Sequence, residues 1–569
     1  MRTRHLATGA RVVSRPRCGH IHHMRTIRSS SPLVALLLGW PFAVSAQQFD
    51  AMEATIPAVH AAMKAKRLTC RQLVQTYLDR IAAYDKQGPA LNAIQTLNPR
   101  ALAEADSLDA VLRARAPRVP LAPLHCVPVL LKDQVETKDM PTTYGSALFR
   151  DFIPKRDATV VQRLEAAGAI ILAKTTMGEF AARYVSSSAG IIRNAYDPTR
   201  NPSGSSGGSG VGVTANFGLV GIGEDTGGSI RGPAAVLSLV GLRPTLPLVS
   251  RFGMLPANPT QDTMGPMTRT VADAARVLDV IAGYDPNDPV TAYSVGEVPR
   301  SYTEALNTGA LRGARIGVLR VRRDSLTRDT SAVPDTTVAR RDSIARRDSM
   351  YKVTTVEMTK VRPLFERAIA DLRAQGATVI DSIRLPELPG RRVDNDFETE
   401  EATNRYLAQH PNAPYKTLRE ILLAGDVTPT RARALMSYVG RSTREAEYGT
   451  VMQYREALRV AVLKIMADQR LDAIIYATYD APPATIPADA LTNARAVDGY
   501  GRGDNRGLSP TLAWPAITVP MGFTSDAFPA GLEFLGRPFT ESRLLGYAYA
   551  YEQATRHRRP PPTTPPLRR

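Results

Sequence analysis

The spacing of apolar residues along the chain predicts helices that alternate with short buried strands. A capping box over residues 69–72 predicts the start of a helix. The apolar face of that helix consists of Leu73, Val74, Tyr77, Leu78 and Ile81. A continuous apolar run over residues 127–131 has the length of a buried strand and leads directly to Lys132.

The order of helix, stop and strand recurs further along the chain. Residues 157–167 predict a helix that ends at Gly168 and is followed by a strand over residues 169–173. The other elements predicted in this way are a helix over 361–375, a stop at Gly376, and strands over 377–380, 473–476 and 516–519. Helices that alternate with short apolar strands are typical of an α/β domain with a mostly buried sheet.

Size and composition are those of a globular protein. The chain has 569 residues, of which 43% are hydrophobic and 22% are charged, so it can bury a large core. The formal net charge is +18, but seven arginines lie in the first 46 residues, which hold no acidic residue. The basic residues form no stripe interleaved with aromatic residues, so we expect no nucleic-acid partner.

Residues 1–46 are interpreted as an upstream extension and a signal peptide. A basic start after Met24, an apolar run over residues 32–44 and small residues ending at Ala46 are the parts of a cleavable secretory signal. The apolar run is too short to cross a bilayer, which takes about 20 residues, so we expect no stable membrane span after cleavage. The mature protein, starting near residue 47, is expected to be secreted or periplasmic.

The folded domain is expected over residues 50–556. Within it, residues 322–350 repeat Arg-Arg-Asp-Ser and hold few apolar side chains, which predicts a solvated low-complexity insertion. The proline- and arginine-rich residues 557–569 predict a disordered tail. Cys70 and Cys126 are the cysteines that remain after the signal, and they indicate neither a disulfide framework nor a zinc site.

Two glycine- and serine-rich clusters carry the chemistry. They are GSSGG at residues 204–208 and TGGS at residues 226–229, with an apolar run over residues 217–222 between them. The first contains G-x-S-x-G, but the turn-rich residues 196–202 before it cannot form the strand that an α/β-hydrolase elbow requires. Neither cluster has the pattern of a phosphate-binding loop. The apolar run also argues against a flexible linker.

These segments resemble the amidase signature family, the Ser-cisSer-Lys hydrolases. The resemblance rests on LHCVPVLLKD at residues 124–133, GSSGGSG at residues 204–210 and GEDTGGSIRGPAA at residues 223–235, and it covers residues 53–555. The chain departs from the family at Cys126 and Ser203, where glycine is usual. The family fold implied is a single α/β/α domain around a mixed central sheet.

The resemblance assigns roles to specific residues. Ser229 is expected to be the nucleophile, Ser205 to relay its proton, and Lys132 to act as the base. Lys132 can be a base only when neutral, so burial must lower its pKa from about 10.4. The backbone N–H groups of the nucleophile loop are expected to form an oxyanion hole; these belong to Thr226, Gly227, Gly228 and Ser229.

Two charged residues flank the nucleophile loop and are interpreted as its supports, namely Asp225 and Arg231. This chemistry requires no histidine, metal or cofactor. The sequence thus predicts an exported amidase that hydrolyses a small-molecule carboxamide through an acyl-enzyme. The alternatives are the glutamine-hydrolysing component of a transfer-RNA amidotransferase and an inactive binding protein on the same fold. The oligomeric state is not predicted.

Overall fold

The computed structural model describes residues 49–115, 120–320, 338–386, 388, 395–496, 498 and 505–567. Of residues 338–354 only the backbone is described. The predicted signal peptide and residues 322–337 of the predicted insertion lie outside the described residues. All described residues belong to one compact unit of the chain, Gln48–Arg569. None of the described helices combines the length and the apolar composition that a bilayer crossing requires.

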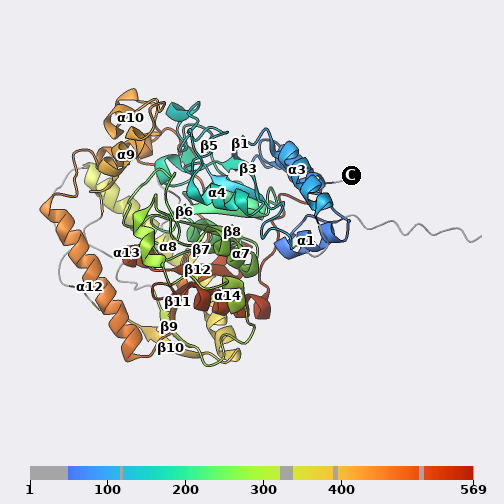
Figure 1. The fold of residues 1–569 in the computed structure, drawn as a ribbon. Coiled ribbons are helices and arrows are strands. Elements are labelled where there is room, and N and C mark those ends of the chain that lie inside the picture. The colour runs from blue at the N-terminus through green and yellow to red at the C-terminus, as the bar shows by residue number, and fades with distance from the viewer. Residues whose placement is uncertain are drawn as a thin grey trace, which may run out of the picture. The chain divides into compact units, whose positions relative to one another are not determined.

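A mixed sheet of eleven strands forms the centre of the domain, in the order β1-β3-β2-β6-β8-β7-β12-β13-β11-β9-β10. In Figure 1 the labels β6, β8, β7, β12, β11, β9 and β10 follow one another down the view in this order. The strands are β1 (Ile94–Leu97), β2 (Pro128–Lys132), β3 (Ile170–Thr175), β6 (Val220–Asp225), β7 (Val240–Arg243), β8 (Thr263–Thr268), β9 (Arg315–Leu319), β10 (Thr378–Ile383), β11 (Ala473–Ala477), β12 (Ala516–Phe523) and β13 (Pro529–Leu535). A separate pair is formed by β4 (Val185–Ser186) and β5 (Gly190–Ile191).

Strand direction changes along the sheet. β2 runs parallel to its neighbours β3 and β6, and β9 runs parallel to β10 and β11. The strands between these two parallel groups pair antiparallel. The core strands are buried along their whole length, as the short continuous apolar runs in the sequence predict.

Two groups of helices pack on this sheet. One group is α5 and α6, which contact each other and the central strands; the other includes α4, α7, α8 and α14. The helices are α1 (Ile56–Lys64), α2 (Cys70–Tyr84), α3 (Ala101–Ala114), α4 (Thr159–Ala166), α5 (Gly207–Thr214), α6 (Arg231–Val236), α7 (Val271–Ile281), α8 (Val338–Ala374), α9 (Thr399–Ala408), α10 (Leu418–Ala424), α11 (Pro429–Met436), α12 (Ala446–Asp468), α13 (Leu508–Leu512) and α14 (Glu541–Thr555). Short 3₁₀ helices are η1 (Ala147–Phe149), η2 (Glu179–Ala181), η3 (Pro289–Ser294) and η4 (Tyr302–Ala305). This is the α/β/α domain with a mixed sheet that the sequence predicts.

The elements predicted from apolar spacing are confirmed. Helix α2 begins with the predicted capping box, in which the side chains of Thr69 and Gln72 each accept from the other's backbone N–H. Helix α4 and strand β3 are joined at Gly168, whose φ of +87° is a left-handed conformation that favours glycine. Strands β2, β10, β11 and β12 also form where the apolar runs predict them.

Residues 338–350 of the predicted solvated low-complexity insertion are helical, which the sequence argument did not predict. These residues form the first turns of α8, which continues to Ala374. The sequence argument excluded a packed core, but it did not exclude a helix. Arginine, alanine and methionine have high helix propensity, so a polar segment can extend a helix that is already anchored.

The prediction of a disordered tail is wrong for residues 557–567. Arg558 forms an ion pair with Glu53 at 2.7 Å, and the carbonyl of Pro565 accepts hydrogen bonds from Arg80 at 2.9 Å and Tyr84 at 2.9 Å. Proline-rich chain lacks its own hydrogen-bond ladder, but here its carbonyls are satisfied by side chains of α2. The tail therefore packs on the N-terminal part of the domain.

A disulfide that the sequence argument did not predict joins Cys70 and Cys126, which are 56 residues apart. Cys70 is the first residue of α2, and Cys126 lies two residues before β2. Both side chains are fully buried. The bond ties an outer helix to the segment that leads into the Lys132 strand.

Candidate active site

Parallel pairing brings Lys132 close to the nucleophile loop. Lys132 is the last residue of β2, and the adjacent strand β6 ends with Glu224 and Asp225. In the register of the two strands, Leu131 pairs with Ile222. Because parallel neighbours end at the same edge of a sheet, the lysine and the two acids meet there.

Lys132 is fully buried and contacts the first serine loop. Its Nζ lies 2.7 Å from Ser205 Oγ and 2.8 Å from Glu224 Oε2. Burial lowers the pKa of Lys132, and the attraction of Glu224 opposes this shift only in part. Burial thus shifts the amine toward the neutral form which a base must have.

The backbone of the Ser205 loop packs so closely against neighbouring backbone that its glycine positions have no room for a side chain. The Gly204–Ser205 peptide bond is cis, as the family resemblance implies. A Cβ on Gly204 would lie 1.6 Å from the carbonyl oxygen of Arg183. A Cβ on Gly208, in helix α5, would lie 2.2 Å from the carbonyl oxygen of Thr176. The glycines of this cluster therefore allow α5 to approach neighbouring backbone.

The Ser229 loop lies against the Ser205 loop. The backbone N–H of Ser206 donates to the carbonyl of Ser229 at 3.4 Å, and the Ser206 hydroxyl donates to the carbonyl of Glu224 at 3.0 Å. Ser229 itself is half-buried, and its hydroxyl makes no hydrogen bond with any described residue. The structure thus brings the three predicted catalytic residues into one region and joins Lys132 to Ser205 directly.

One of the four N–H groups predicted for the oxyanion hole has a partner within the loop. The N–H of Gly228 donates to Asp225 Oδ1 at 2.7 Å and so helps to hold the loop. The N–H groups of Thr226, Gly227 and Ser229 have no acceptor within the described part of the chain. These three groups remain the available donors. The spacing of residues could not reveal which N–H the neighbouring carboxylate occupies.

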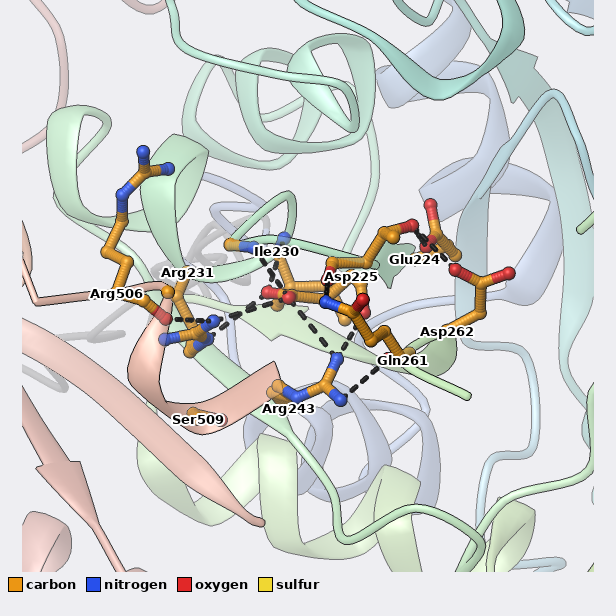
Figure 2. Close-up of polar contacts among 12 residues, drawn as sticks. Glu224, Asp225, Ile230, Arg231, Arg243, Gln261, Asp262, Arg506 and Ser509 are labelled. Atoms are coloured by element: carbon orange, nitrogen blue, oxygen red, sulfur yellow. Dashed lines mark hydrogen bonds and ion pairs between the residues drawn. The ribbon is translucent and has the colours of Figure 1, made fainter. Parts of the chain in front are cut away.

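Asp225 and Arg231 support the loop through a buried ion-pair network (Figure 2). Asp225 also accepts from the N–H of Ile230 at 3.1 Å, and Arg231 Nε reaches Asp225 Oδ2 at 3.2 Å. Burial acts to raise the pKa of Asp225, but Arg231 and Arg243 outweigh it and hold that pKa well below its usual range. Asp225 is thus ionised at neutral pH and fixes both ends of the turn that carries Ser229.

Two members of this ion-pair network come from distant parts of the chain and were not predicted from the sequence. Arg243, at the end of β7, donates to the Asp225 backbone carbonyl and lies 3.3 Å from Asp225 Oδ1. Glu533, on β13, pairs with Arg231. Burial lowers the pKa of Arg243 to about 10, although Asp225 opposes the shift. No local motif marks these residues, because only the sheet order brings β7 and β13 near the loop.

A second acidic cluster lies on the Lys132 side of the loop. The Thr226 hydroxyl lies 2.5 Å from Glu224 Oε1 and 2.7 Å from Asp262 Oδ1. Glu224 stands beside Asp225 in the GEDTGGS motif, so consecutive acids at a strand end were the available signal for it. Asp262 directly precedes β8 and had no signal in the sequence.

Met177, Phe180 and Tyr184 lie in a helix-like stretch of sequence, which favours a place in the core over a place in a substrate pocket. Their exposures of 0%, 5% and 2% agree with that interpretation.

In the described residues, no group of three or more His, Cys, Asp or Glu side chains could hold a metal ion. His410 lies 2.9 Å from Glu136, outside the contacts of Lys132 and Ser205.

Residues 72–545 match the family model named Amidase. The chain belongs to the amidase signature family. It is 32% identical to a probable amidase of Arabidopsis thaliana over 90% of this chain and 92% of that protein. It is also 32% identical to the A-type component of the glutamyl-tRNA(Gln) amidotransferase of Exiguobacterium over 88% of this chain and 97% of that protein.

A similar solved structure is the native peptide amidase of Stenotrophomonas maltophilia, with a TM-score of 0.76, 34% identity and coverage of 90% of this chain and 98% of that one. The A-type component of the glutamyl-tRNA(Gln) amidotransferase of Thermotoga maritima matches with a TM-score of 0.61 and 23% identity, over 89% of this chain and 96% of that one. The second likeness shows the common fold alone. The chain is therefore an amidase-family enzyme that acts on C–N bonds.

Proposed function

We propose that the protein is an exported amidase that hydrolyses a carboxamide through an acyl-enzyme on Ser229. Neutral Lys132 takes the proton of Ser205, and Ser205 takes the proton of Ser229 as its oxygen attacks the amide carbonyl. The proton then returns along the same path to the leaving amine as the C–N bond breaks, and a water molecule, deprotonated through the same relay, attacks the acyl-enzyme and releases the acid from Ser229. The observation that carries the proposal is the 2.7 Å contact between buried Lys132 and Ser205, next to a loop whose serine hydroxyl has no described partner.

The oxyanion formed in each acyl-transfer step needs donors that are already in place. The N–H groups of Thr226, Gly227 and Ser229 are the candidates, and removal of one such donor typically slows an enzyme by about 10²- to 10³-fold. Asp225 keeps the turn in shape by accepting from the N–H groups of Gly228 and Ile230. Asp225 is a support and does not touch the substrate in this scheme.

Export is proposed on two independent grounds. The first is the predicted signal peptide, which follows an upstream extension, starts at Met24 and ends at Ala46. The second is the disulfide between Cys70 and Cys126, since disulfides persist mainly in oxidising compartments outside the cytosol. N-terminal sequencing of exported protein tests this part, and a mature start near residue 47 is expected. An uncleaved cytosolic protein would contradict it.

The role of an amidotransferase component remains a second candidate function, because several relatives carry that name at 31–33% identity. The likeness to peptide amidase favours hydrolysis of a free amide instead, with peptide amides as the first substrate class to test. Assays on peptide amides, amino-acid amides, aryl anilides and fatty amides, set against glutamine with charged transfer RNA, separate the two. Activity on glutamine with transfer to an acceptor would support the amidotransferase role.

Labelling with a fluorophosphonate probe tests the assignment of the nucleophile without knowledge of the substrate. Wild-type protein and a Ser437→Ala control, at an exposed serine, should both be labelled. Ser229→Ala should lose labelling, and its kcat should fall by about 10⁴-fold or more. A covalent adduct that persists in folded Ser229→Ala would rule out Ser229 as nucleophile.

A further inference from the structure

The position of the Thr226 hydroxyl constrains the protonation of the two acids beside it. Its oxygen lies 2.5 Å from Glu224 Oε1 and 2.7 Å from Asp262 Oδ1, both within hydrogen-bond distance. A threonine hydroxyl has a single proton, so it can donate to only one of these carboxylates. The other contact is a hydrogen bond only if that carboxyl group carries a proton itself.

Both acids are fully buried, so water cannot compensate for an unfavourable contact. Asp262 also accepts from the backbone N–H groups of Ala257 at 2.8 Å and Asn258 at 2.9 Å. Glu224 accepts from Lys132 at 2.8 Å. Burial, together with the negative charge of Glu224, raises the pKa of Asp262 to about 7.

The other charged groups that face these acids are already paired. Asp225 and Arg243 interact with each other, and Arg251 lies 2.8 Å from Asp288. Lys132 is thus the cation that directly contacts the Glu224 and Asp262 pair in the described residues.

We propose that Glu224 and Asp262 hold one proton between them through the Thr226 hydroxyl, and that Glu224 is the positioning residue which orients the Lys132 amine toward Ser205. The inference rests on the proposed function, because it deepens the role of Lys132 as base. The shared proton stays on the pair throughout the reaction. The proton that moves is the one from Ser229, which passes by Ser205 to Lys132 and back to the leaving amine.

Two amide variants test the sharing of a proton, with the rate of fluorophosphonate labelling measured against pH. Glu224→Gln keeps an acceptor for Lys132 and a donor for Thr226 but removes the nearest negative charge. The inflection that reports Lys132 should therefore move to lower pH by at least about 1 unit, as is typical for loss of a close opposite charge. Asp262→Asn mimics the protonated acid and leaves the charge on Glu224. Its inflection should not move to lower pH.

The opposite behaviour of the two variants is the decisive result. If both acids were ionised, Asp262→Asn would also remove a negative charge near Lys132, and its inflection would fall like that of Glu224→Gln. That outcome, in variants with unchanged melting temperature, overturns the proposal. Asp79→Asn, at an exposed acid of α2, serves as the matched control and should leave the inflection unchanged.

Failure of this inference is distinguishable from failure of the proposed function. Labelling that survives in Ser229→Ala would reject the nucleophile, whatever the two amide variants do. Loss of labelling in Ser229→Ala together with equal downward shifts in both variants would reject only the shared proton. An unchanged inflection in folded Glu224→Gln would reject the positioning role of Glu224.

Discussion

Removal of the Cys70–Cys126 disulfide should destabilise the domain by a predictable amount. The bond closes a loop with a sequence separation of 56 residues, for which the loss of chain entropy in the unfolded state corresponds to about 4 kcal/mol at 25 °C. Unfolding entropy is about 2.1 cal/mol/K per residue, or about 1 kcal/mol/K for a domain of roughly 500 residues. The melting temperature should therefore fall by about 4 °C.

Differential scanning calorimetry of three samples measures this effect. These are oxidised wild-type protein, wild-type protein refolded in reductant, and the double variant Cys70→Ala with Cys126→Ala. The two samples without the bond should melt about 4 °C below the first, and the double variant somewhat lower because both side chains are fully buried. Equal melting temperatures with and without reductant would refute the entropic argument. Free thiols at both Cys70 and Cys126 in protein that has not been exposed to reductant would refute the bond itself.

Three further outcomes are expected. First, kcat/KM should rise with pH, with an inflection below the lysine reference of about 10.4, because burial lowers the pKa of Lys132 and the base acts only above it; an inflection lost on mutation of a histidine would contradict this. Second, Gly208→Ala should abolish folding or activity, because its Cβ would lie 2.2 Å from a backbone oxygen. The control Gly449→Ala lies in α12 where there is open space, and in urea denaturation it should leave the stability of the domain unchanged or raise it by up to about 1 kcal/mol. Third, Arg558→Ala should lower the melting temperature and speed proteolysis of the C-terminal residues because it breaks the ion pair with Glu53 at 2.7 Å, and unchanged proteolysis would show that the pair does not hold the tail.

Much of the fold could be predicted because local patterns determine it. The capping box at Thr69 and the stop at Gly168 act within a few residues, so their outcome depends little on distant parts of the chain. The strand before Lys132 was recognisable because it is buried along its whole length and therefore apolar throughout. The three catalytic candidates were assigned by the resemblance to the amidase signature family, and the structure places two of them, Lys132 and Ser205, 2.7 Å apart.

Helix α5 shows where local reasoning fails. Its sequence is GGSGVGVT, which has poor helix propensity and looks like a loop. All its residues are buried, and the glycines permit contacts with neighbouring backbone that larger residues would prevent. Tertiary packing therefore overrides propensity here, and only the assembled fold shows it. The same holds for the tail, whose carbonyls are satisfied by Arg80 from far along the chain.

The site brings together charged side chains from distant parts of the chain, which the sequence alone could not place next to one another. Their charges explain how they are arranged around the nucleophile loop. The buried ionisable side chains around the nucleophile loop are Lys132, Glu224, Asp225, Arg231, Arg243, Asp262 and Glu533. On one side of the loop, two arginines face two acids. On the other side, one lysine faces two acids that share a threonine hydroxyl.

Charge balance explains why one proton is shared on the side of the loop where Lys132 faces Glu224 and Asp262. An unpaired charge in a buried site is strongly unfavourable, so two ionised acids beside one lysine would be a costly arrangement. One proton held between Glu224 and Asp262 leaves a single negative charge opposite Lys132. A single opposing charge holds the amine in place at 2.8 Å, while burial still lowers its pKa. Two opposing charges would favour the ammonium form more strongly and would leave less of the neutral base that Ser205 requires.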